Sequence, residues 1–92
     1  MSSALTMTKI VVADVEAAAA FYTAVCGYSV AQRIEDAHFC EIILQTDTPG
    51  AGVLIVIAYF DQPLPPPGAS VLVFEMRDID AFVARAVAAW PG

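Results

Sequence analysis

A short internal repeat constrains this chain more than any other feature of its sequence. The tetrapeptide Asp14-Val15-Glu16-Ala17 returns 64 residues later as Asp78-Ile79-Asp80-Ala81, with the same type of residue at every position. Each copy follows an apolar segment and opens an alanine-rich stretch, and each begins with an aspartate suited to cap a helix. The chain therefore uses a unit of strand, capping aspartate and helix twice.

The rest of the pattern predicts an α+β chain in the order strand, helix, three strands, strand, helix. Alternating or continuous apolar runs favour strands, and Gly27 ends the first helix. The antiparallel pairing of three consecutive strands needs only short loops. The expected strands are Leu5–Ala13, Tyr28–Glu35, His38–Gln45, Val53–Phe60 and Ser70–Met76, and the expected helices are Val15–Cys26 and Ile79–Trp90.

The second unit of the repeat is shorter than the first. We expect residues 1–68 to form a βαβββ module and residues 69–92 to begin a second module, together making one structural domain. The last helix presents an apolar face of Ile79, Phe82, Val83, Ala86, Val87 and Trp90, and we expect this face to be buried against a sheet. Since the three further strands of such a sheet are missing, we infer that dimerisation supplies them. The sequence leaves open whether this truncation is natural.

Composition excludes several classes of partner. The formal net charge of −6 argues against nucleic acid and anionic membrane surfaces, which require basic patches. No apolar run approaches the ~18 residues of a membrane helix, and no secretory leader is expected. Cys26 and Cys40 lie too far apart for a metal-binding pair and are expected to be buried thiols in a reducing, cytoplasmic compartment.

Several motifs resemble the vicinal-oxygen-chelate superfamily, which includes glyoxalase I, bleomycin-resistance proteins and extradiol dioxygenases. A strand followed by Asp14-Val15-Glu16, Phe21-Tyr22 and Val25-Cys26-Gly27-Tyr28 is similar to the first module of that superfamily. The run 73–81 is similar to the start of the second module, so the resemblance covers residues 5–90. It implies a glyoxalase-like fold in which the sheets of two βαβββ modules curl into a shared cup.

The resemblance also implies where a divalent metal would bind in enzymes of the family. One ligand, usually histidine, lies on the first strand of each module, seven residues before the capping aspartate. Those positions hold Met7 and Val71, which do not suit a hard divalent ion. The expected carboxylate of the fourth strand is missing from Val53–Phe60. We therefore expect no metal and no cofactor.

Without a metal, the cup would be an apolar site for a small molecule. Strand alternation places two polar anchors, Lys9 and Glu75, among the apolar residues of the expected lining. The alternative is that both are solvent-facing charges. The expected ligand-binding residues are Met7, Lys9, Val11, Val71, Val73 and Glu75.

No catalytic residue can be assigned from the sequence, and whether the chain is an enzyme stays open. His38 is the only histidine, and it shares a strand face with Cys40, but no third group completes a catalytic set. The aromatic residues Phe21, Tyr22, Phe74 and Trp90 are expected to pack in the core.

The function that these observations favour is binding of a small molecule at a homodimer interface, as the bleomycin-resistance branch does. The acidic charge would suit a cationic ligand. Two alternatives remain open: a metal-dependent lyase or dioxygenase, and a truncated member that only assembles. A ferredoxin-like α+β fold also remains open, although it would place two strands between the helices rather than four. The identity of the ligand is not indicated.

Overall fold

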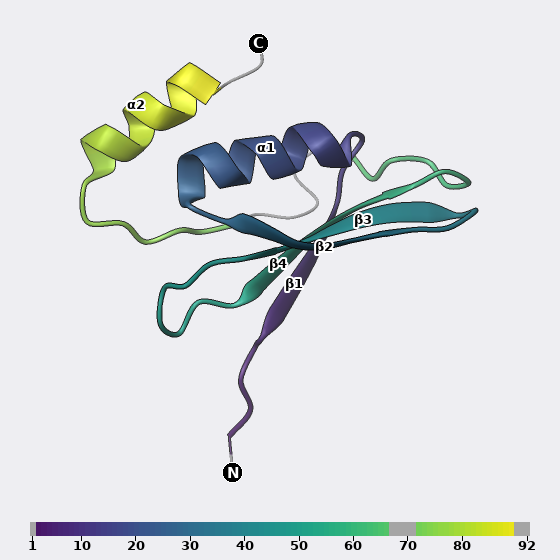
Figure 1. Ribbon diagram of the computed structural model, residues 1–92, viewed down its shortest axis with the longest axis horizontal. Helices are drawn as coiled ribbons and strands as arrows, with labels where there is room; N and C mark the ends of the chain where they lie inside the picture. Colours follow the sequence, from purple (N-terminus) through teal and green to yellow (C-terminus); the bar gives the residue numbers. More distant parts are fainter. Residues whose placement is uncertain (1, 67–71, 90–92) are drawn as a thin grey trace.

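The computed structural model describes residues 2–66 and 72–89, which form an α+β fold with one sheet and two helices (Figure 1). The α+β prediction is confirmed, and each helix and strand lies within two residues of its expected bounds. The elements are β1 (Met7–Val11), α1 (Val15–Cys26), β2 (Ser29–Glu35), β3 (Phe39–Gln45), β4 (Val53–Tyr59) and α2 (Ile79–Ala89).

The four strands form one mixed sheet in the order β1-β4-β3-β2. β2, β3 and β4 pair antiparallel through short loops, whereas β1 lies parallel to β4 because α1 carries the chain back across the sheet. The register places Lys9 beside Ile55, and Ile57 between Val11 and Glu41. These pairings decide which side chains share a face of the sheet.

Helix α1 begins and ends where its local chemistry predicts. The Asp14 carboxylate accepts a hydrogen bond of 3.1 Å from the backbone N–H of Ala17, which satisfies one of the free donors of the first turn. Gly27 ends the helix with a φ of 77°, a left-handed conformation that glycine adopts without strain. The same type of cap starts α2, where Asp78 accepts from the N–H of Ala81 at 3.0 Å.

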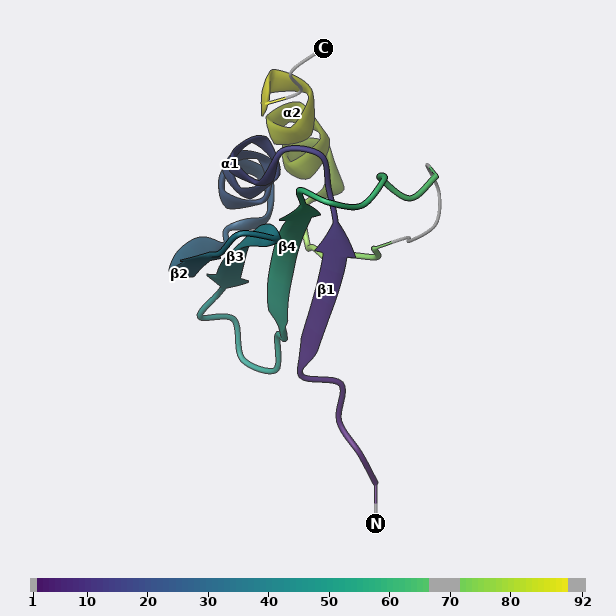
Figure 2. The same ribbon diagram turned by 90° about the vertical axis from the view of Figure 1, so that its right-hand side faces the viewer.

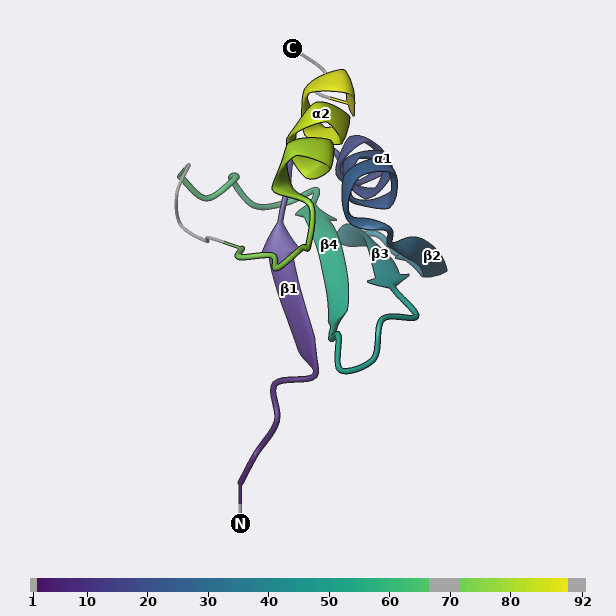
Figure 3. The same cartoon turned by 90° about the vertical axis from the view of Figure 1, so that its left-hand side faces the viewer.

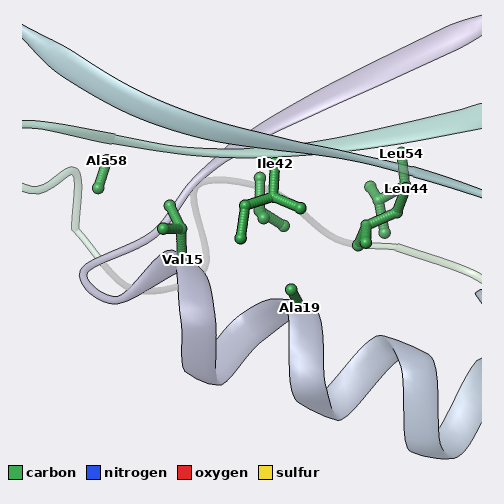
Figure 4. Packing of buried hydrophobic residues seen from close by; sticks show 7 residues of the cluster. Val15, Ala19, Ile42, Leu44, Leu54 and Ala58 are labelled. Atoms are coloured by element: carbon green, nitrogen blue, oxygen red, sulfur yellow. The ribbon is translucent and has the colours of Figure 1, made fainter. Parts of the chain in front are cut away.

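The core lies between α1 and the sheet (Figure 4). Val15 and Ala19 of α1 point toward strand residues that alternate onto the same face, including Ile42 and Leu44. The small alanines let the helix approach the sheet closely. The complete cluster is Val15, Ala19, Ile42, Leu44, Leu54, Val56 and Ala58.

Helix α2 packs against α1 and contacts no strand within the described residues (Figures 2 and 3). Within one chain its apolar face is therefore not buried against a sheet, and burial against a sheet that a second copy supplies stays a prediction. Phe82 and Ala86 are half-buried, whereas an apolar stripe of Ile79, Val83 and Val87 is exposed on another side of the helix. Trp90 lies outside the described residues.

One contact fixes α2 to the C-terminal end of α1. The Arg85 guanidinium donates a hydrogen bond of 3.3 Å from Nε to the backbone carbonyl of Val25. The last turn of α1 contains no basic residue of its own. Arg85 therefore supplies the positive charge that favours the negative end of the helix dipole.

The expected fifth strand is not formed over residues 72–76, the part of it that the structure describes. These residues run beside α1: Leu72 packs against the core, and the Phe74 ring lies 6.1 Å from Tyr22 and 6.4 Å from Tyr28, measured between ring centroids. A strand needs a neighbouring backbone to pair with, and these residues have none within the described chain. The expected boundary at residues 68 and 69 lies outside the described residues.

Candidate functional site

The two faces of the sheet have different surroundings. α1 covers one face, onto which Ile10, Val12 and the core residues of β3 and β4 point. The alternate residues point to the opposite face, and neither helix covers it. We call this the free face. Its central members are Met7, Lys9 and Val11 from β1, Glu41 and Ile43 from β3, and Ile55 and Ile57 from β4.

The free face combines a buried apolar floor with exposed side chains on β1. Ile55 and Ile57 are buried between their strand neighbours, although no helix lies over them. Met7, Lys9 and Val11 are exposed beside them. Three of the six expected ligand-binding residues therefore share one face of one strand, as their spacing predicts.

An ion pair lies on this face. The Lys9 Nζ atom lies 3.6 Å from an Oε2 of Glu41. The Glu41 side chain is only 10% exposed, whereas the Lys9 side chain is 48% exposed. Glu41 is the only charged residue among the buried residues of the described chain, and its position opposite Ile57 places it at the centre of the sheet.

Glu41 was not among the expected site residues. The expected partner of Lys9 was Glu75, because each is the charged residue on the side of its expected strand that would face the cup. The signal for Glu41 was present in the run Phe39-Cys40-Glu41-Ile42-Ile43-Leu44, where one carboxylate interrupts an apolar strand. Sequence alone does not show which face that carboxylate takes or that β1 brings a lysine to it.

The remaining expected site residues lie elsewhere. Val73 and Glu75 are exposed in the segment 72–76, and Val71 lies outside the described residues. Glu75 lines a shallow depression of about 250 Å³ beside Cys26 and Arg85, at the C-terminal end of α1. Within one chain, the structure therefore brings Met7, Lys9 and Val11 together on the free face, whereas Glu75 lies away from this face at the end of α1.

A larger cavity of about 670 Å³ lies along β1 on the side away from β4. Its walls come from residues 9–13, α1, the segment 64–66, residues 72 and 74, and α2, and they are mainly apolar. Phe21 and Tyr22 contribute from α1, and Phe82 contributes from α2. It follows the strand edge that has no backbone partner within the described residues and reaches the free face only at Lys9 and Val11.

His38 has a partner that sequence reasoning did not identify. Its Nδ1 lies 2.9 Å from a carboxylate oxygen of Asp61, and both side chains are largely exposed. Asp36 accepts backbone hydrogen bonds from His38 and Phe39, which builds the expected turn before β3. An exposed histidine–aspartate pair is no nucleophilic site without an adjacent nucleophile.

Both cysteines are free and half-buried. Burial raises the pKa of the Cys26 thiol, and the nearby Arg85 charge opposes this rise. Burial also raises the pKa of Cys40, and the carboxylates of Glu35, Glu16 and Asp14 add to the effect. Thiols with raised pKa values are poor nucleophiles near neutral pH, so neither cysteine has the properties of a catalytic thiol.

The donor atoms of the free face do not fit a divalent metal. Met7 supplies a soft thioether, β4 supplies no carboxylate, and Glu41 already faces the Lys9 ammonium. In residues 2–66 and 72–89, no three His, Cys, Asp or Glu side chains gather in a way that could hold a metal ion.

Neither α1 nor α2 has the length and apolar character that a bilayer crossing takes.

Comparison with known proteins identifies the family. The family model described as the Glyoxalase/Bleomycin resistance protein/Dioxygenase superfamily matches residues 4–89. A search of curated proteins gives no significant match to the chain. The match covers nearly the whole chain, including both copies of the capped helix, and agrees with the glyoxalase-like arrangement of β1, α1 and the three following strands. The chain belongs to the Glyoxalase/Bleomycin resistance protein/Dioxygenase superfamily.

Proposed function

We propose that this protein binds a small, largely apolar molecule on the free face, in a cup that a second copy of the chain completes. One observation carries the proposal: the free face has an apolar floor, a buried carboxylate and a neighbouring ammonium group, and neither helix covers it. Small-molecule sites commonly combine apolar walls with a few polar groups that fix the orientation of the ligand.

The unfinished repeat supports the role of a second copy. β1 has one strand neighbour, and the segment 72–76, which precedes the second capping aspartate as β1 precedes the first, has none within the described residues. α2 exposes an apolar stripe, whereas a helix of this kind normally buries such a stripe against a sheet. In the proposed dimer, Val71, Val73 and Glu75 of one copy join Met7, Lys9 and Val11 of the other around the cup.

Nothing on the free face favours the metal-dependent alternative, a lyase or dioxygenase. Such chemistry would require ligands that this face does not supply, because its only carboxylate is paired with a lysine. We therefore propose binding rather than metal-dependent catalysis as the function of the cup.

A ligand screen read by methyl NMR tests the proposal directly. Binding at the free face should shift the methyl signals of Met7, Val11 and Ile55 while leaving Leu44 and Val56, on the α1 side, nearly unchanged. Bound ligand should also raise the melting temperature, because it favours the folded state. Light scattering on the same samples should give the mass of a dimer. A protein that stays monomeric, with no ligand shifting the free-face methyls, would refute the proposal.

A further inference from the structure

The Glu41 carboxylate has an unusual environment for a charged group. Nine-tenths of its side chain is buried, and its nearest cation, Lys9 Nζ, lies 3.6 Å away. A charge-assisted N–H···O bond is typically ~2.7–2.9 Å long, so this pair is too far apart to form one. Within residues 2–66 and 72–89, no other group donates a hydrogen bond to the Glu41 side chain.

No buried side-chain oxygen of the described residues lacks a hydrogen-bond partner, so the Glu41 carboxylate oxygens keep contact with solvent although the rest of the side chain is covered. Partial loss of water around a charge is unfavourable, so stability alone does not explain why this position holds glutamate. The side-chain neighbours of Glu41 across the sheet are Ile57 on β4 and Ile34 on β2. An apolar residue at position 41 would match these neighbours and remove the cost of desolvation. A carboxylate kept in such a place is suited to receive a donor from outside the protein.

We propose that Glu41 and Lys9 together recognise a cis-amide edge, as found in a lactam, on an uncharged and otherwise apolar ligand; this inference rests on the proposed function of the cup. The N–H of a cis-amide and its C=O point in the same direction. The N–H donates to Glu41, which accepts only, and the C=O accepts from Lys9, which donates only. The ligand thus supplies the complementary group to each member of the pair.

The surroundings of the pair select the rest of the ligand. Met7 and Val11 flank Lys9 along β1, and Ile43 and Ile55 lie across the sheet from it. Apolar side chains on all these positions favour a flat, apolar frame. A ligand with a full charge would leave one member of the ion pair facing a like charge, so the amide is neutral.

Three matched probes test the inference on the full-length chain. 2-Quinolone carries a cis-amide edge on an aromatic frame, N-methyl-2-quinolone lacks the N–H donor, and quinoline lacks both amide groups. Titrations followed by NMR of the Met7, Val11 and Ile55 methyls give the three dissociation constants. We expect 2-quinolone to bind at least ten times more tightly than either control, because only it engages both charges.

Two variants separate recognition from a structural role. Glu41→Leu should abolish the preference for 2-quinolone while the melting temperature stays the same or rises. Lys9→Met should reduce the preference and leave the fold intact, because Lys9 is half exposed. A Glu41→Leu protein that melts lower but keeps the preference would assign Glu41 to structure and overturn the inference.

The outcomes for the inference and for the proposed function are distinct. If all three probes shift the free-face methyls with equal affinity, the cup binds apolar molecules and the proposed function stands, but recognition of the amide edge is refuted. If no probe shifts these methyls, the inference is refuted, and the proposed function then depends on the wider screen.

Discussion

The exposed apolar stripe of α2 gives the sharpest test of assembly. Val87 lies near the end of this stripe and is 71% exposed in the single chain. Full burial of a valine side chain contributes roughly 1.5–3 kcal/mol. Less than a third of its surface is buried here, so Val87→Asp should cost the isolated chain only about 0.5–1 kcal/mol of this amount.

In a symmetric dimer that buries the stripe, the same substitution has a larger effect. Each copy loses burial of the 71% of Val87 that the single chain leaves exposed, and for the two copies this amounts to about 2–4 kcal/mol. Since 1.4 kcal/mol corresponds to roughly tenfold in a dissociation constant, the dimer should weaken by about 30-fold to 1,000-fold. Sedimentation equilibrium measures this constant, and urea unfolding at low concentration measures the stability of the single chain.

Ala88→Asp is the matched control for this experiment. It places the same charge at the same end of α2, at an exposed position outside the stripe. Both substitutions therefore carry the same unfavourable interaction with the helix dipole. Equal weakening of the dimer by both variants, or no weakening by Val87→Asp, would refute the assignment of the stripe to the interface.

Three further predictions concern stability and reactivity. Asp14→Ala removes the cap that binds the Ala17 N–H and should lower the free energy of unfolding by about 1 kcal/mol, whereas Asp14→Asn should retain most of it; equal losses in urea unfolding would contradict the capping role. Leu44→Ala empties a fully buried site between α1 and the sheet and should cost about 2–5 kcal/mol, while the same change at exposed Leu64 should cost far less. Because the pKa values of Cys26 and Cys40 are raised, both thiols should alkylate more slowly than a free cysteine at pH 7, with rates that keep rising above the ordinary thiol pKa; a plateau near neutral pH would show that the thiolates are stabilised.

Sequence was sufficient where local chemistry decides the structure. The first and last residues of α1 match the prediction because Asp14 and Gly27 act on their own backbone neighbourhood. β4 was predicted from a continuous apolar run of the length typical of a strand and shorter than a typical helix. The positions of Met7, Lys9 and Val11 on one face follow from the two-residue period of a strand.

Sequence was insufficient where distant segments decide the structure. The periodicity of α2 shows that it has an apolar face, but not that Phe82 turns toward α1 while Val83 and Val87 stay exposed. Residues 72–76 have a strand-like composition, yet no strand forms there without a backbone partner. Glu41 could not be identified as a site residue from sequence, because only the strand register shows that it lies beside β4 and within reach of Lys9.

The hydrogen bond from Arg85 to Val25 has a consequence for the dynamics of the chain. The positive charge that favours the end of α1 belongs to another helix, so release of α2 also removes the partner of that carbonyl. Fraying of the last turn of α1 and detachment of the C-terminal helix are therefore coupled events, while the hydrogen bonds among β2, β3 and β4 do not depend on either. Any partner that draws α2 away would loosen one end of α1 and leave the sheet intact.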